Sequence, residues 1–346
     1  MAADAARPGR WGLLLMALAA FLLVPATPLV QSVAPLRDTS WMVVVTLAIC
    51  MVVGWGGGGR GWLAVLWVLL AAAVLASTPI VHPAYASLER GWAVLLAGAF
   101  GLVCETSPSA TPFFTRALTA LAMSVSIAGM LAAVTPGGLR TSAGAARSDA
   151  EGRPNAALVW MRESELSPEW QRWRAKGAGT SLDDAVQTAD SVVASLPVDA
   201  VPYFPALLGL ESLAALALCW GLYHRISRTR LGEQLAALRD FSFSDHLVWG
   251  LIAGIILAIL PVPAAWRGTG MNLLLFFGTL YVVRGLGVLA WYLEAAGAGA
   301  LMITALAIAA AILSAPAVLG LGLVGLGDTW MDWRHRPGGA TPGPTT

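Results

Sequence analysis

Long apolar runs recur along the whole chain, and they constrain its fold more than any other feature. A helix needs about 20 apolar residues to cross the hydrocarbon core of a bilayer. Inside that core the backbone has no water to bind, so such runs fold as helices. We therefore predict an all-α, polytopic transmembrane helix bundle of eight to ten spans. The nine candidate runs are residues 11–30, 41–55, 61–80, 91–104, 113–134, 201–223, 247–262, 271–293 and 299–326.

The composition supports a membrane protein. Hydrophobic residues make up 57% of the chain and charged residues 12%, whereas about a quarter of a soluble protein is charged. The net charge of +1 provides no field that would attract nucleic acid. The lipid bilayer is therefore the first expected partner.

One sizeable polar segment divides the chain. We predict a five-span membrane region over residues 1–135, an extracytoplasmic loop segment over 136–200, a second membrane region over 201–327 and a cytoplasmic or interfacial tail over 328–346. Within the loop segment, residues 137–154 are rich in Gly, Ala, Ser and Arg and are expected to be loose. Helical stretches are predicted at 155–176, with a new turn at Pro168, and at 181–196.

Arginine placement predicts the orientation. Arg225, Arg228 and Arg230 crowd the link after the sixth run, and such residues accumulate in cytoplasmic loops. This places the N-terminus in the cytoplasm and residues 136–200 outside, in a multi-pass protein of a bacterial cytoplasmic (inner) membrane. Nine simple crossings would leave Arg334 outside. Either a break at Pro316 makes residues 299–326 a pair of re-entrant helices, or the accumulation of arginine in cytoplasmic segments does not hold for the tail.

Two ionisable residues lie in the middle of apolar runs, Glu211 in the sixth and Arg284 in the eighth. A charge at the centre of a bilayer costs a few kcal/mol or more, so we predict that the two side chains pair. The pair either fixes the register of two helices or forms a polar binding site or proton-coupled gate.

The eighth run carries further polar side chains. Asn272 opens it, and Tyr281 lies three residues before Arg284, on the same helical face. Glu211, Asn272, Tyr281 and Arg284 are therefore the predicted substrate-binding residues. Glu105 and Arg116 flank the turn between the fourth and fifth runs, where we expect both charged groups to reach water.

A second candidate surface would bind a protein. It combines Arg225, Arg228 and Arg230 of the basic link with Asp328, Asp332 and Arg334 of the tail. The alternative for the tail is an amphipathic stop at the membrane interface.

The sequence lacks the residue patterns of catalytic and metal sites. Four histidines are scattered, and no His-Glu-x-x-His or Gly-x-Ser-x-Gly motif occurs. Cys50, Cys104 and Cys219 have no close spacing, which favours small buried apolar residues over a metal site. We predict no enzymatic activity, no catalytic residue, no metal and no cofactor.

The second half of the chain carries several short motifs. They are Met271-Asn272, Tyr281, Gly285-Leu286, Gly327-Asp328 and Asp332-Trp-Arg334. On these residues the chain resembles the YybS-like family of bacterial polytopic membrane proteins, most closely from about residue 202 to 336. Arg284 stands where the family pattern has Gln.

The hydropathy layout of this family is similar to that of the S components of energy-coupling-factor transporters. The resemblance implies a component that binds or transports a small solute. The alternative is a non-transporting membrane scaffold that docks cytoplasmic partners through the basic link and the tail. A third possibility, an enzyme acting on lipid-linked substrates, lacks a nucleophile or metal cluster.

Overall fold

The structure is a computed structural model that describes residues 11–77, 83–175, 191, 194–297 and 315–334. Every regular element in these ranges is a helix, which confirms the predicted all-α fold. The helices form two compact units, Met1–Leu235 (unit 1) and Ala236–Thr346 (unit 2).

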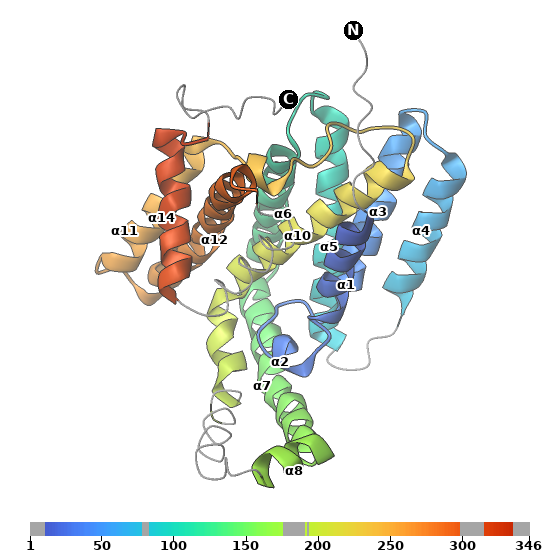
Figure 1. Ribbon diagram of the computed structural model, residues 1–346. Coiled ribbons are helices and arrows are strands. Elements are labelled where there is room, and N and C mark those ends of the chain that lie inside the picture. The colour runs from blue at the N-terminus through green and yellow to red at the C-terminus, as the bar shows by residue number, and fades with distance from the viewer. Residues whose placement is uncertain (1–10, 78–82, 176–190, 192–193, 298–314, 335–346) are drawn as a thin grey trace. The chain divides into compact units, whose positions relative to one another are not determined.

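Unit 1 contains most of the helices (Figure 1). They are α1 (Trp11–Leu23), α2 (Pro28–Gln31), α3 (Thr39–Gly56), α4 (Gly61–Ala76), α5 (Pro83–Thr106), α6 (Phe113–Val134), α7 (Gly138–Glu165), α8 (Pro168–Ala175), the 3₁₀ turn η1 (Val201–Tyr203) and α10 (Phe204–Ile226). Unit 2 has the 3₁₀ turns η2 (Leu238–Asp240) and η3 (Asp245–Leu247), followed by α11 (Val248–Ile259), α12 (Ala264–Ala295) and α14 (Ala315–Met331).

Five helices of the described ranges are long and apolar enough to cross a membrane. They are Thr39–Gly56, Ala84–Thr106, Phe113–Val134, Ala194–Ile226 and Ala264–Ala295. Three further runs form shorter apolar helices, Trp11–Leu23, Gly61–Ala76 and Asp245–Ile259. The ninth run is seen from Ala315 onward, with Pro316 in the first turn of α14, where proline fits a helix. The protein is thus a polytopic membrane protein.

The centre of unit 1 is α3, which packs against α4, α5 and α10. Along α3 the side chains of Met42, Thr46 and Leu47 are fully buried. One end of the unit gathers residues 32–38, the start of α5 and α7, and we call it the outer end. The other end carries residues 57–60, the turn before α6 and the basic link, and we call it the inner end. The two names follow the orientation that the arginine pattern predicts, which stays a prediction.

The prediction that residues 137–154 are loose is wrong. They form most of α7, which packs against α2, α5 and α6 and buries Asp149 and Arg153 one turn apart. A paired, i,i+4 spaced Asp and Arg stabilise the helix despite its low hydrophobicity. The new turn at Pro168 is confirmed as the start of α8. Most of the predicted stretch at 181–196 lies outside the described residues.

In unit 2, α12 packs against both α11 and α14. Glycines let the backbones of α12 and α14 touch. A Cβ atom on Gly325 would lie 2.7 Å from the backbone nitrogen of Gly285, closer than a real Cβ can approach. Small residues of this kind are what close helix packing inside a membrane requires.

This crossing can be tested with a matched pair of substitutions in α12. Gly285→Val would place its side chain against the backbone of Leu321, and we expect a loss of about 1–3 kcal/mol, as in overpacked cores. Gly278→Val introduces the same residue where a Cβ meets no atom within 4 Å. Unfolding in mixed micelles, followed by tryptophan fluorescence, should separate the two variants. Equal stability would contradict the close crossing.

Candidate functional site

The buried charges of unit 2 meet at Asp328 on α14. Its Oδ2 atom accepts hydrogen bonds from Arg284 Nε at 3.0 Å and from Arg334 Nη2 at 2.6 Å. All three residues are buried, with 1% of Asp328 exposed. Burying a charge is costly unless it is paired and hydrogen-bonded, and here one carboxylate neutralises two guanidinium groups in part.

Further bonds close this cluster. Arg334 Nη1 donates to the carbonyl oxygens of Arg239 at 2.8 Å and Phe241 at 3.0 Å. Arg284 Nη1 reaches Asp245 Oδ1 at 3.2 Å, while the ring of Phe243 lies 5.2 Å from the Arg284 guanidinium carbon. Arg284 thus has two aspartate partners within its own unit, and these supply the opposite charge that the sequence analysis expected from Glu211.

The local sequence explains this geometry. Gly285 follows Arg284, and Gly325 precedes Asp328 by three residues, so the close crossing of α12 and α14 brings the two charges together. At the end of α14, Asp332 has φ = 38°, a left-handed conformation that Asp tolerates better than most residues. The chain turns there, and Arg334 reaches back to Asp328.

The structure regroups the residues predicted from the sequence. Tyr281 and Arg284, expected to bind a solute, lie with Asp328 and Arg334, expected to dock a partner. Tyr281 is buried and its ring contacts Phe243, with centroids 5.2 Å apart. Asn272 is not part of this cluster, since it lies 12 residues before Arg284, or about 18 Å along the helix. Its Nδ2 donates to Gly268 O at 2.9 Å.

Glu211 lies in unit 1, where its carboxylate binds the backbone of the loop before α3. Its Oε2 accepts a hydrogen bond from the backbone N–H of Leu36 at 3.3 Å. The next N–H, that of Arg37, donates to Glu89 Oε1 at 2.5 Å. Two carboxylates from α10 and α5 thus hold consecutive amides of the loop that leads into α3.

Asp149 on α7 completes this outer network. Its carboxylate lies 2.7 Å from both Arg37 Nη2 and Arg153 Nη2. Arg153 also donates to the carbonyl oxygens of Gln31 at 2.8 Å and Ala34 at 2.5 Å. The loop at 32–38 is therefore held by side chains of three different helices.

Sequence reasoning missed Arg37, Glu89, Asp149 and Arg153. The i,i+4 spacing of Asp149 and Arg153 was the available signal. It was obscured because the surrounding composition indicated a loose segment.

At the inner end of unit 1, the basic link folds against the helix ends. Arg116 Nη1 donates to Leu231 O at 2.5 Å, and Nη2 donates to Pro108 O at 2.7 Å. The expectation that Arg116 reaches water is wrong: it is fully buried, because carbonyl groups replace its water. Glu105 is exposed, as expected.

The three arginines of the link differ in their contacts and in their exposure. Arg225 Nη1 donates to Gly221 O at 3.0 Å, and its guanidinium lies 5.9 Å from the centre of the Trp11 ring. Arg228 and Arg230 are exposed. Asp332 in the tail is exposed as well.

No group of three or more His, Cys, Asp or Glu side chains could hold a metal ion in the part of the chain that the structure describes. The three cysteines are free and buried, as the apolar interpretation predicts.

A structural role for Glu211 predicts a specific pattern of tolerance. Glu211→Gln keeps an oxygen that can accept from Leu36 N–H, so its stability should stay within about 1 kcal/mol of the wild type. Glu211→Leu leaves that buried N–H unsatisfied and should cost about 1–3 kcal/mol. Unfolding in mixed micelles measures both. Equal losses in the two variants would contradict this role.

The Asp328 cluster predicts a strong effect of a single change. Asp328→Asn leaves two buried guanidinium groups without their shared charge and should cost about 3–5 kcal/mol. Asp245→Asn removes a partner whose side chain is 65% exposed, so the loss should be below about 1 kcal/mol. A double-mutant cycle with Arg284→Gln and Asp328→Asn should show coupling, and additive losses would contradict the contact.

Comparison with known proteins places part of the chain in context. Residues 165–329 match the model of a family described as "Predicted membrane protein (DUF2232)". The matched region contains Glu211, Arg284 and Asp328, and it ends before Arg334. No curated protein and no solved structure matched the chain. The match confirms the expected resemblance to a family of polytopic membrane proteins and does not extend to S components. Over residues 165–329, the chain is therefore similar to the predicted membrane proteins of this family.

Proposed function

We propose that the protein is a non-transporting membrane scaffold that docks an acidic cytoplasmic partner through Arg228 and Arg230. One observation carries this proposal. Both arginines are exposed and form no hydrogen bond or ion pair with any residue that the structure describes, although the link that bears them is fixed.

The link has a defined conformation that would present these side chains to a partner. Thr229, between them, donates from its hydroxyl to Gly54 O at 3.2 Å. His224 Nε2 lies 3.0 Å from Gly232 O, and Trp220 Nε1 donates to Glu233 O at 2.9 Å. A pre-ordered link loses little conformational freedom when a partner binds, which favours affinity.

The charges inside the spans support a scaffold over a transporter. Glu211 and Arg284 are engaged by partners within their own units. A transport site needs polar groups that can exchange internal partners for a solute. The contacts of Glu211 and Arg284 within their own units instead favour helices that are held in one arrangement. The proposal includes no catalytic step.

Solute binding is the second candidate, and one observation favours it. Asp328 Oδ1 and Arg334 Nε are buried without a hydrogen-bond partner among the described residues. A small polar solute could satisfy them. Native mass spectrometry of the purified protein would detect such a solute, and its retention by the wild type but not by Asp328→Asn would favour this candidate.

The scaffold proposal can be tested by photo-crosslinking in native membranes. A photoreactive residue at exposed Gln234 should capture a cytoplasmic protein. Arg228→Gln with Arg230→Gln should reduce that adduct about threefold to tenfold, the effect of two exposed ion pairs. High salt should weaken it as well.

The matched control makes the same change of charge at the outer end. Arg140→Gln with Arg162→Gln replaces two exposed arginines of α7 and should leave the adduct unchanged. An adduct that survives in the Arg228 and Arg230 double variant, or crosslinks to lipid alone, would overturn the proposal.

A further inference from the structure

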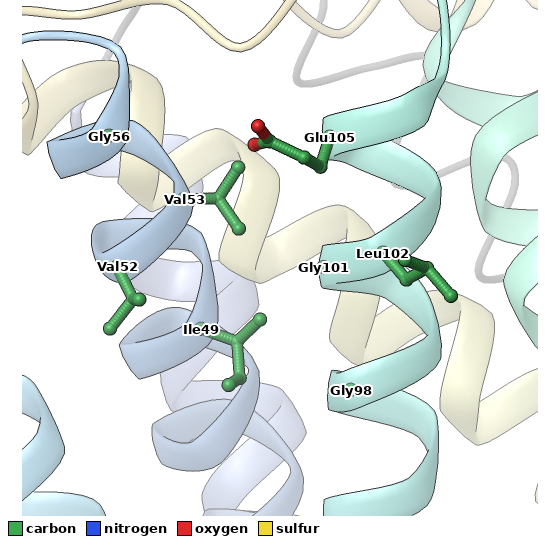
Figure 2. A pocket seen from close by; sticks show the side chains of 8 residues that line it. All are labelled: Ile49, Val52, Val53, Gly56, Gly98, Gly101, Leu102 and Glu105. Carbon is green, nitrogen blue, oxygen red and sulfur yellow. The ribbon is translucent and has the colours of Figure 1, made fainter.

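A groove lies between α3 and α5 in the inner half of these two spans (Figure 2). Its volume is about 410 Å³, within the range of roughly 300–1,000 Å³ that is typical of ligand sites. The lining is apolar except at one end. It consists of Ile49, Val52, Val53, Gly56, Gly98, Gly101, Leu102 and Glu105.

Glycines create the groove. Gly101 is buried and forms the floor, where a Cβ would collide with the Ile49 side chain and lie 3.6 Å from Val53 Cγ2. One turn earlier, a Cβ on Gly98 would meet no atom within 4 Å. The two helices therefore touch at Gly101, while the absence of a side chain at Gly98 leaves space beside this contact.

The groove opens toward lipid. α3 and α5 are both long and apolar enough to cross a membrane, and the side chains of Val52 and Leu102 on its rims are exposed. From Gly98 to Glu105 the helix rises about 10 Å. Over that length the volume corresponds to a mean width of about 7 Å, below the roughly 10–12 Å of a helix with its side chains. A hydrocarbon chain is slender enough to fit.

Glu105 gives the groove a chemical preference. It lies one residue before the end of α5, is exposed, and forms no ion pair within the described ranges. Figure 2 shows that its carboxylate points from α5 toward α3 and lies above the Val53 side chain in this view. At the level of the lipid headgroups, a carboxylate repels anionic groups and accepts strong hydrogen bonds from a primary ammonium.

We propose that this groove binds one phospholipid with a primary-amine headgroup, of the phosphatidylethanolamine class. An acyl chain lies along Gly98 and Gly101, and the ammonium donates to Glu105. A quaternary ammonium has no N–H to donate, and a phosphatidylglycerol headgroup is anionic, so neither offers this contact. The site is separate from the basic link and does not depend on the scaffold proposal.

Native mass spectrometry of the full chain tests this site. The purified protein is incubated with phosphatidylethanolamine, phosphatidylcholine or phosphatidylglycerol of identical acyl chains. We expect one phosphatidylethanolamine to be retained about tenfold more than either other lipid, the effect of a charge-assisted hydrogen bond. Glu105→Gln should remove this preference while retaining a lipid without headgroup selection.

Two substitutions in α5 separate the groove from general lipid contact. Gly98→Leu fills the groove without colliding with a neighbour and should abolish the retained lipid. Gly91→Leu, also at an open position of α5, should keep it. Equal retention of the three lipids by the wild type, or an unchanged lipid in Gly98→Leu, would overturn the proposal. The proposal would also be overturned if the partner lost from Gly98→Leu were a protein helix and not a lipid.

Discussion

The need to neutralise ionised groups in an apolar interior is the constraint on which the rest of this structure depends. Asp328 meets it by binding Arg284 and Arg334 together. These contacts join α12, α14 and the tail of unit 2, and Arg334 extends them to the backbone at residues 239 and 241. Removing one of these residues would leave the other charged groups buried without a partner, and this would lower the stability of the fold strongly.

Unit 1 uses the same solution with different elements. Asp149 binds Arg37 and Arg153, and Arg153 also satisfies carbonyl groups of the loop that enters α3. In both units a fully buried aspartate joins two arginines that are distant from each other in the sequence. Because hydrogen bonds to charged groups are stronger than those between neutral groups, one residue can fix several chain segments.

Buried and exposed charges have different places in this protein. The interior carboxylates and guanidinium groups hold helices together, whereas the groups that we propose for recognition are exposed. Arg228 and Arg230 stand on a fixed link, and Glu105 stands at the mouth of a groove made by missing side chains. The protein and lipid partners that we propose would therefore bind to helices whose arrangement is already fixed.

The sequence by itself determined the helical class, because long apolar runs can fold only as helices within a bilayer. It also identified Glu211 and Arg284 as charges that require partners, since their cost follows from position alone. Tertiary structure decided which partners they have. Arg284 binds a residue 44 positions away and Glu211 one 175 positions away, and packing at Gly285 and Gly325 sets the first contact. Likewise, Arg116 is buried because distant carbonyl groups replace water, and no local pattern encodes that replacement.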